Sequence, residues 1–226
     1  MTPPTSSAVS PEARKARRAD PQATSEGVVS PKASSADATP QALDEEIRDV
    51  ALRLLSVRAR SAREMEESLR EKGFEARRIP ACVQWLQERG YLDDEEFAGA
   101  FIRDRVRFSP RSPFLLKREL EEKGVPRSLA QQVLDRVLEE NAWTEGTLAL
   151  RAAEGWVRKQ GPESCRALLA PRFTKERERA RKRLYGFLAR RGFVGDALGL
   201  GMEAGEKAAR DRTTNGAPPH DSPSEE

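Results

Sequence analysis

Histidine, cysteine and aromatic residues are scarce in this sequence. Its 226 residues include one His, at position 220, and two Cys, at 82 and 165, and aromatic residues make up 6% of the chain. A single imidazole is too few for a His-based metal site, and it lies in the C-terminal tail, outside the predicted fold, which leaves no His for a Cys-His catalytic pair. Two Cys are also too few for a disulfide framework, and their apolar neighbours favour reduced thiols. We therefore expect no enzyme activity, no metal and no cofactor, and a cytoplasmic location.

Long apolar runs are also absent. No stretch approaches the roughly 18 apolar residues that span a membrane, and the first residues have no apolar core of the kind that a signal peptide carries. Residues 1–43 are rich in Pro, Ser and Ala, and residues 203–226 form an acidic segment; neither shows apolar periodicity. Segments of this composition bury too little surface to offset the entropy of ordering. We predict that both are disordered and that the protein has no membrane contact.

The middle of the chain, residues 44–202, has helical spacing throughout and no convincing alternation typical of strands. Ser61 with Glu64, and Asp93 with Glu96, have the spacing of a helix N-terminal capping box. One pattern occurs three times: Leu, three residues, Gly, then an apolar residue, at Leu69–Phe74, Leu120–Val125 and Leu188–Phe193. It is typical of helices that end at a left-handed glycine.

These signals predict an all-α fold of tandem three-helix modules. The expected boundaries are 44–108, 109–160 and 161–202. Because each module in such an array contacts only its neighbours, we expect an elongated, curved arrangement.

Four consecutive carboxylates, at Asp93, Asp94, Glu95 and Glu96, form the densest acidic cluster. Carboxylates grouped in this way are able to hold a metal or to act as acid and base. They also stand at a predicted helix start, where acids stabilise the helix dipole and cap free N–H groups. We favour the capping interpretation over an enzyme site.

Positive charge is concentrated in two stretches, although the whole chain carries a net charge of only +3. Residues 101–118 hold six basic residues against one acidic residue, and residues 166–191 hold ten against two. Such concentration favours a polyanion or an acidic protein as partner, and arginine suits bidentate phosphate or carboxylate contacts. A solvated helix face is the alternative explanation. The candidate binding residues are Arg103, Arg107, Arg111, Lys117, Arg118, Lys175, Arg179, Arg183, Arg190 and Arg191.

Several of these residues lie four apart in the sequence. Arg103 and Arg107 share one helix face, as do Lys175, Arg179 and Arg183. Like charges at this spacing repel one another by a few tenths of a kcal/mol for each pair. The cost indicates a partner that supplies the opposite charge.

Several motifs occur in a specific order along the chain. Arg58, Ser61 and the Lys72-Gly73 pair are followed by Gly-Tyr-Leu-Asp-Asp-Glu-Glu-Phe-Ala at residues 90–98. Glu-Leu-Glu-Glu-Lys-Gly-Val follows at 119–125 and Phe-Leu-Ala-Arg-Arg-Gly-Phe at 187–193. This order resembles that of the RecX family of RecA-recombinase regulators. It departs from the family pattern at Ser112-Pro113, where Gly-Pro is common. The third module is expected to end soon after Leu198, without a full last helix.

The resemblance implies a cytoplasmic bacterial protein that is not an enzyme. It implies three tandem three-helix modules that bind the RecA nucleoprotein filament, restrain its ATPase and strand exchange, and so damp recombination, DNA repair and the SOS response. Some members of the family also bind single- or double-stranded DNA directly. We expect this protein to act as a monomer. The alternative is a stand-alone helical DNA-binding protein, for which steep salt dependence on naked DNA is expected.

Overall fold

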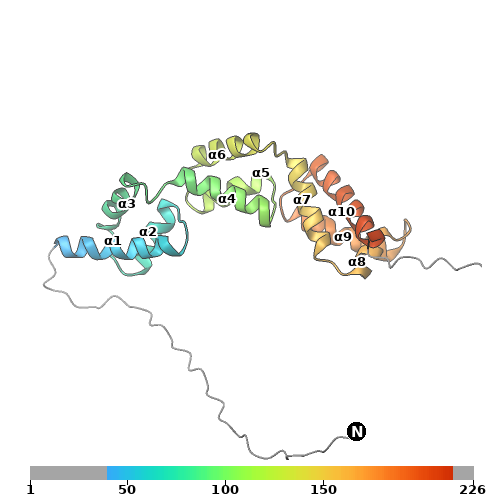
Figure 1. Ribbon diagram of the computed structural model, residues 1–226, viewed down its shortest axis with the longest axis horizontal. Helices are drawn as coiled ribbons and strands as arrows, with labels where there is room; N and C mark the ends of the chain where they lie inside the picture. The colour runs from blue at the N-terminus through green and yellow to red at the C-terminus, as the bar shows by residue number, and fades with distance from the viewer. Residues whose placement is uncertain (1–39, 216–226) are drawn as a thin grey trace, which may run out of the picture. The chain divides into compact units, whose positions relative to one another are not determined.

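The computed structural model describes residues 40–215, and within that range it contains ten α-helices and no strand (Figure 1). The all-α class and the tandem helical modules are therefore confirmed. The predictions of disorder for residues 1–39 and 216–226, the latter including His220, fall outside the described range. Residues 40–43, also predicted to be disordered, instead form the first turn of a helix that begins at Pro40. The helices are α1 Pro40–Val57, α2 Ala62–Glu71, α3 Ile79–Glu88, α4 Asp94–Phe108, α5 Pro113–Glu122, α6 Arg127–Glu140, α7 Glu145–Arg158, α8 Pro162–Leu169, α9 Lys175–Ala189 and α10 Gly195–Asn215.

Helices α1 to α3 share one small apolar core. Met65 and Leu69, four residues apart on α2, are fully buried against Ile47 of α1 and Leu86 of α3. This spacing places both side chains on one helix face, as the sequence pattern predicts. Ser61 caps α2 because its hydroxyl accepts a hydrogen bond from the Glu64 N–H at 3.1 Å. The first module therefore forms through the caps and the apolar stripe that are visible in the sequence.

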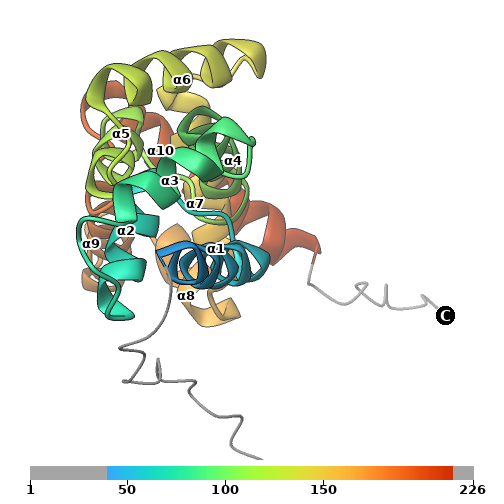
Figure 2. The same cartoon turned by 90° about the vertical axis from the view of Figure 1, so that its left-hand side faces the viewer.

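Helices α4 to α6 pack together, and α6 covers α4 and α5 in both views of the ribbon (Figures 1 and 2). Ile102 and Val106 of α4 are buried in the same apolar cluster as Leu116 and Leu120 of α5. The expected boundary at 108/109 therefore falls between two helices of one group. The Ser109-Pro110 turn marks a break in the chain, but a turn inside a module has the same sequence character as a turn between modules.

Helices α7 to α10 form the last group, in which α7 packs mainly along α10 (Figure 1). This group has four helices instead of the expected three, because the short helix α8 lies between α7 and α9. The expected boundary at 160/161 separates α7 from the helices on which it packs. Leu148 and Ala152 of α7 share a buried cluster with Leu184 and Leu188 of α9, and this packing joins residues far apart in the sequence.

Helix α10 corrects two further expectations. Residues 203–215 continue this helix instead of forming a disordered tail, and the third module does have a complete last helix. Gly201, Gly205 and Ala209 recur every four residues and are buried, so a stripe of small residues lets α10 approach α7 and α9 closely. Glycine and alanine give weak hydropathy, and for this reason the sequence did not reveal the packed face.

Three helices end as the repeated Leu/Gly pattern predicts. Gly73, Gly124 and Gly192 have φ of +87°, +87° and +82°, in the region that favours glycine. At the last of them, the Gly192 N–H donates to the Ala189 carbonyl and the Phe193 N–H to the Leu188 carbonyl. The other two glycines have the same pair of bonds, which defines the Schellman motif.

Two of these glycine ends also abut the cap of an earlier helix. The buried Ser61 donates its hydroxyl to the carbonyl of Lys123, the residue before Gly124. The buried Ser112, which caps α5, donates its backbone N–H to the carbonyl of Arg191, the residue before Gly192, at 2.9 Å. The serine cap of α2 thus contacts the glycine end of α5, and the serine cap of α5 contacts the glycine end of α9, so each group of helices is joined to the next. We call these two contacts the serine–glycine junctions.

The first serine–glycine junction contains an ion pair that makes stability depend on pH. Burial alone would raise the pKa of Glu64, but hydrogen bonds from Arg58 and Lys123, both at 2.8 Å, outweigh it and hold that pKa below its ordinary value of 4.5. A lowered carboxyl pKa stabilises the folded state above pH 4.5, and this contribution is lost as the pH falls through the folded-state value. We expect Glu64→Gln to lower stability at pH 7 and to flatten the acid limb of the stability curve.

Urea unfolding of wild type and Glu64→Gln between pH 7 and pH 3 measures this effect. Glu67→Gln is the matched control, because the Glu67 carboxylate pairs with Arg63 at 3.0 Å on the exposed surface of the same helix. Exposed pairs contribute about 0–1 kcal/mol, so the control is expected to follow wild type closely. Parallel curves for wild type and Glu64→Gln would contradict the prediction.

Candidate functional site

The acidic cluster at residues 93–96 has structural partners. The Asp93 side chain accepts hydrogen bonds from the N–H groups of Glu95 at 2.8 Å and Glu96 at 3.1 Å, as an N-terminal cap does. Asp94 accepts from the Ala62 N–H at 2.8 Å, and Glu95 pairs with Arg136. Within residues 40–215, no group of three or more His, Cys, Asp or Glu side chains has the arrangement of a metal site. The capping interpretation of Asp93 is confirmed.

The two cysteines are both free and buried. Burial raises the pKa of the Cys82 thiol, which keeps it in the unreactive protonated form. Both positions serve packing. In the described part of the chain, none of the helices is long and apolar enough to cross a bilayer.

The candidate residues of the first basic stretch differ in whether they form an ion pair within the fold. Arg103 and Arg107 are exposed on α4 and form no ion pair with any described residue. Arg111 instead pairs with Glu119, which is buried and also binds Arg105 at 2.9 Å. Arg118 pairs with Glu122 at 3.1 Å, and Lys117 is half-buried. Arg111 and Arg118 therefore have counter-charges within the fold, whereas Arg103 and Arg107 have none there.

The second stretch places its candidate residues along α9 and at its end. Lys175, Arg179 and Arg183 are exposed and, among described residues, have no ion-pair partner. Arg190 is exposed just after the helix. Arg191 is half-buried, with its guanidinium carbon 3.7 Å from the centre of the Phe187 ring.

The structure brings Arg107 and Arg191 together in one cleft of about 470 Å³. The cleft lies between the end of α4, the loop after it, α7 and the end of α9. Three further basic residues line it, Arg151 and Arg158 from α7 and Lys159 from the C-cap of that helix, and Glu154 is its one acidic lining residue. We call these five cations and the space between them the basic cleft.

Sequence reasoning missed these three residues. Arg151, Arg158 and Lys159 are spread over nine positions that also contain Glu154, so their local excess is only two positive charges, well below that of the two basic stretches. Only the packing of α7 beside the ends of α4 and α9 adds them to Arg107 and Arg191. Their residue type alone gave no usable signal.

Arg191 is the least solvated cation of the basic cleft. Burial, and then the nearby charges of Arg111 and Arg190, lower the pKa of its guanidinium, although an arginine stays charged at neutral pH. Its Nε is buried without a hydrogen-bond partner, and so is the Nε of Arg111. Since the Ser112 N–H holds the Arg191 carbonyl, the second serine–glycine junction fixes this residue at the edge of the cleft.

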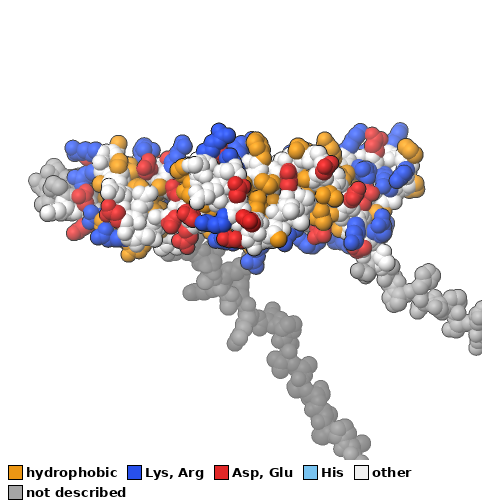
Figure 3. All heavy atoms as spheres, turned by 90° about the horizontal axis from the view of Figure 1, so that it is seen from above, with side chains coloured by type: hydrophobic (Ala, Val, Ile, Leu, Met, Phe, Trp, Pro, Cys, Tyr) orange, Lys and Arg blue, Asp and Glu red, His pale blue; other side chains and the backbone are white. Residues whose placement is uncertain are grey.

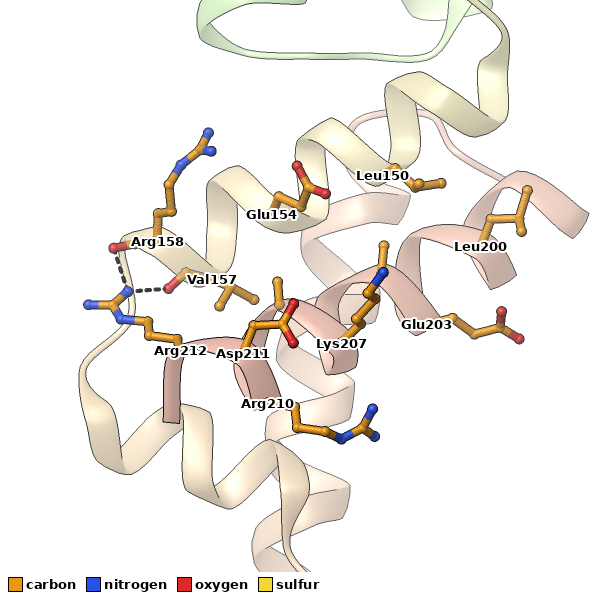
Figure 4. Close-up of a pocket in the computed structure, with 12 residues that line it drawn as sticks. Leu150, Glu154, Val157, Arg158, Leu200, Glu203, Lys207, Arg210, Asp211 and Arg212 are labelled. Carbon is orange, nitrogen blue, oxygen red and sulfur yellow. Dashed lines mark hydrogen bonds between the residues drawn. The ribbon is translucent and has the colours of Figure 1, made fainter. Parts of the chain in front are cut away.

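A second and larger groove, of about 930 Å³, lies between α7 and α10 (Figure 4). Arg212 reaches across from α10 and donates to the carbonyls of Val157 at 2.8 Å and Arg158 at 2.7 Å. The groove is lined by charges of both signs, which come from Glu154, Glu203 and Asp211 and from Arg158, Lys207, Arg210 and Arg212. Charges of both signs also alternate over the face drawn in Figure 3. Neither surface has the excess of positive charge that the basic cleft has, with five cations against Glu154.

The chain is similar to proteins of one family. A family model for the first three-helix domain of RecX matches residues 48–86, and one for the second three-helix domain matches residues 93–134. The second match begins at the cap of α4, in agreement with the packing of α4 on α5 and α6.

Several relatives match over about 70% or more of this chain. The regulatory protein RecX of Halorhodospira halophila is 31% identical over 169 residues, which cover 74% of this chain and 92% of that protein. The RecX of Geobacillus thermodenitrificans is 38% identical over 53% of this chain, and the match spans 43% of that relative's length. A crystal structure of RecX from Lactobacillus salivarius has the same fold, with a TM-score of 0.55, 18% identity, and coverage of 73% of this chain and 97% of that one. The chain therefore belongs to the RecX family.

Proposed function

We propose that this protein is a negative regulator of the RecA recombinase. It binds the RecA–DNA filament in the cytoplasm, inhibits ATP hydrolysis and strand exchange, and thereby modulates recombination and the SOS response. The observation that carries the proposal is the match to a regulatory protein RecX over 92% of that relative's length. The protein is not an enzyme, and the fold is consistent with this because the acidic cluster and the thiols are used for capping and packing.

The filament presents phosphates and acidic side chains, and unpaired cations are suited to both. The exposed row Lys175, Arg179 and Arg183 on α9 offers such cations, together with Arg103 and Arg107 on α4. A protein that binds one filament state more tightly than another shifts the filament toward that state. Occupation of the filament by the helical modules then opposes the subunit rearrangements that hydrolysis and strand exchange require.

DNA-dependent ATP hydrolysis by RecA, measured with and without this protein, tests the proposal. We expect hydrolysis to fall as the protein approaches stoichiometric amounts. The variant Lys175→Glu/Arg179→Glu/Arg183→Glu is expected to inhibit about tenfold less effectively, because its three carboxylates are repelled by the negative groups of the filament that the three cations would contact. Arg53→Glu/Lys207→Glu/Arg210→Glu makes the same change in net charge at exposed residues elsewhere and is expected to inhibit like wild type. No inhibition by wild type would refute the proposed function.

A further inference from the structure

The turn between α8 and α9 presents a phenylalanine that does not pack on the rest of the fold. Phe173 has a relative exposure of 103%, so its ring is open to water on all sides. Burial of apolar surface is the main favourable contribution to folding, and this ring adds nothing to it. Exposure alone needs no explanation, since single apolar side chains are common at protein surfaces. The backbone of the same residue supplies a second and independent observation.

The backbone of Phe173 is strained. Its φ is +70°, in the left-handed region that favours glycine, and elsewhere in residues 40–215 only five glycines and Ala142 have a positive φ. The Thr174 N–H closes the turn by donating to the Pro171 carbonyl at 3.3 Å, which makes Phe173 the third of its four residues. A positive φ at that position is the requirement of a type II turn, and glycine satisfies it without strain. Strain that no packing offsets points to a function of the side chain.

Hydrogen bonds hold this turn in one position. The Thr174 hydroxyl caps α9 by accepting from the Arg177 N–H at 3.4 Å, and it donates to the Pro171 carbonyl at 2.9 Å. The Arg177 guanidinium donates to the Ala170 carbonyl at 2.9 Å and pairs with Glu206 of α10 at 3.1 Å. A ring on a fixed turn loses little conformational freedom when a partner covers it, which favours tight binding.

Unpaired cations border the ring. Arg172 directly before it and Lys175 two residues after it are exposed, and neither forms an ion pair with a described residue. Arg177 and Arg181, which line a groove of about 510 Å³ beside the ring, instead share the carboxylate of Glu206. The free charge around the ring is therefore positive. An apolar pocket with carboxylates at its rim would complement both the ring and its border.

We propose that Phe173 is an anchor that inserts into an apolar, acid-rimmed pocket on a protein partner. Arg172 and Lys175 pair with carboxylates at the rim. The inference rests on the proposed function and deepens it, since Lys175 also begins the row Lys175, Arg179 and Arg183, and RecA in the filament then carries the pocket. A bilayer is a poorer partner because it takes up several apolar side chains at once, whereas the neighbours Arg172 and Thr174 are charged and polar.

Phe173→Gly separates an anchor from a structural residue. Biolayer interferometry measures binding of the full-length protein to a RecA filament formed on immobilised oligothymidine. We expect the variant to bind about tenfold or more weakly, because a few anchor residues carry most of the affinity of an interface. Its melting temperature is expected to rise by about 2 °C, since glycine adopts a positive φ without strain. A ring that served the fold would give a lower melting temperature instead.

Two further variants complete the experiment. Phe114→Ala is the matched control, because Phe114 is 72% exposed but lies at the start of α5, and we expect it to bind within about twofold of wild type. Phe173→Leu keeps an apolar side chain for the pocket and is expected to bind within about threefold of wild type. Thermal unfolding followed by circular dichroism verifies the folding of each variant.

The possible outcomes distinguish the inference from the proposed function. If wild type binds the filament and Phe173→Gly binds equally well, or melts at a lower temperature, the inference fails and the proposed function stands. An equal loss of affinity for naked oligothymidine, or for vesicles of phosphatidylcholine and phosphatidylserine, would assign the ring to a base or a bilayer and would also overturn the inference. If wild type does not bind the filament, the proposed function fails and the inference fails with it.

Discussion

Gly192→Ala is expected to destabilise the protein by about 3 kcal/mol. A left-handed conformation costs an L-residue about 1–2 kcal/mol, and Gly192 has φ +82°. A Cβ at this position would also overlap the hydroxyl of Ser112, which is fully buried, and press against Leu115. Overpacking of this kind adds about 1–3 kcal/mol. Urea unfolding followed by circular dichroism measures the loss.

Gly90→Ala is the control for the conformational part of the effect. Gly90 has φ +70°, but a Cβ there would have no atom within 4 Å, so we expect a loss of only about 1 kcal/mol. Gly124→Ala is expected to cost at least as much as Gly192→Ala, since its Cβ would overlap the Cβ of Arg63, which rotation of the Arg63 side chain does not move. Equal losses at Gly90 and Gly192 would show that the second serine–glycine junction is not closely packed.

Gly192→Ala is also expected to affect the basic cleft. Its neighbour Arg191 is held by the Ser112 N–H, and displacement of this junction would move the guanidinium that lies over Phe187. The cleft is thus built on a structural contact between modules, and its geometry depends on a residue without a side chain.

Truncation after Met202 is the second large effect. It removes the part of α10 that contains the buried Ala209. The same part contains Glu206, whose carboxylate pairs with both Arg177 and Arg181. The loss of apolar packing against α7, and of the carboxylate that these two arginines share, is expected to cost on the order of 4 kcal/mol. For a chain of this size, the melting temperature would fall by about 10 °C.

Truncation after Asn215 is the matched control, because it removes only residues that follow α10. We expect thermal unfolding of this shorter deletion to coincide with that of the full chain. If the protein truncated after Met202 melted at the same temperature as the full chain, the packing of residues 203–215 would contribute nothing to stability. That result would contradict the prediction.

The candidate site shows where sequence reasoning succeeds. Arg107 and Arg191 were found because each lies in a stretch where basic residues outnumber acidic ones, a property that can be counted along the chain. Arg111 and Arg118 were found by the same count but have partners within the fold, in Glu119 and Glu122. A count of charges along the sequence does not show which cations are paired with a carboxylate and which are available to bind a ligand. The Arg118–Glu122 pair lies within one helix, at the i,i+4 spacing, whereas the pairing of Arg105 and Arg111 with the buried Glu119 depends on how α4 and α5 pack together.

The sequence by itself determined the all-α class, the serine and aspartate caps and the glycine ends, because each depends on residues within one or two helical turns. Tertiary structure alone decided that α4 packs with α5 and α6, that residues 203–215 complete α10, and that Arg151, Arg158 and Lys159 join Arg107 and Arg191. The physical reason is common to all three. Burial and charge pairing depend on side chains tens of residues apart, and a stripe of Gly and Ala buries a face that local hydropathy does not reveal.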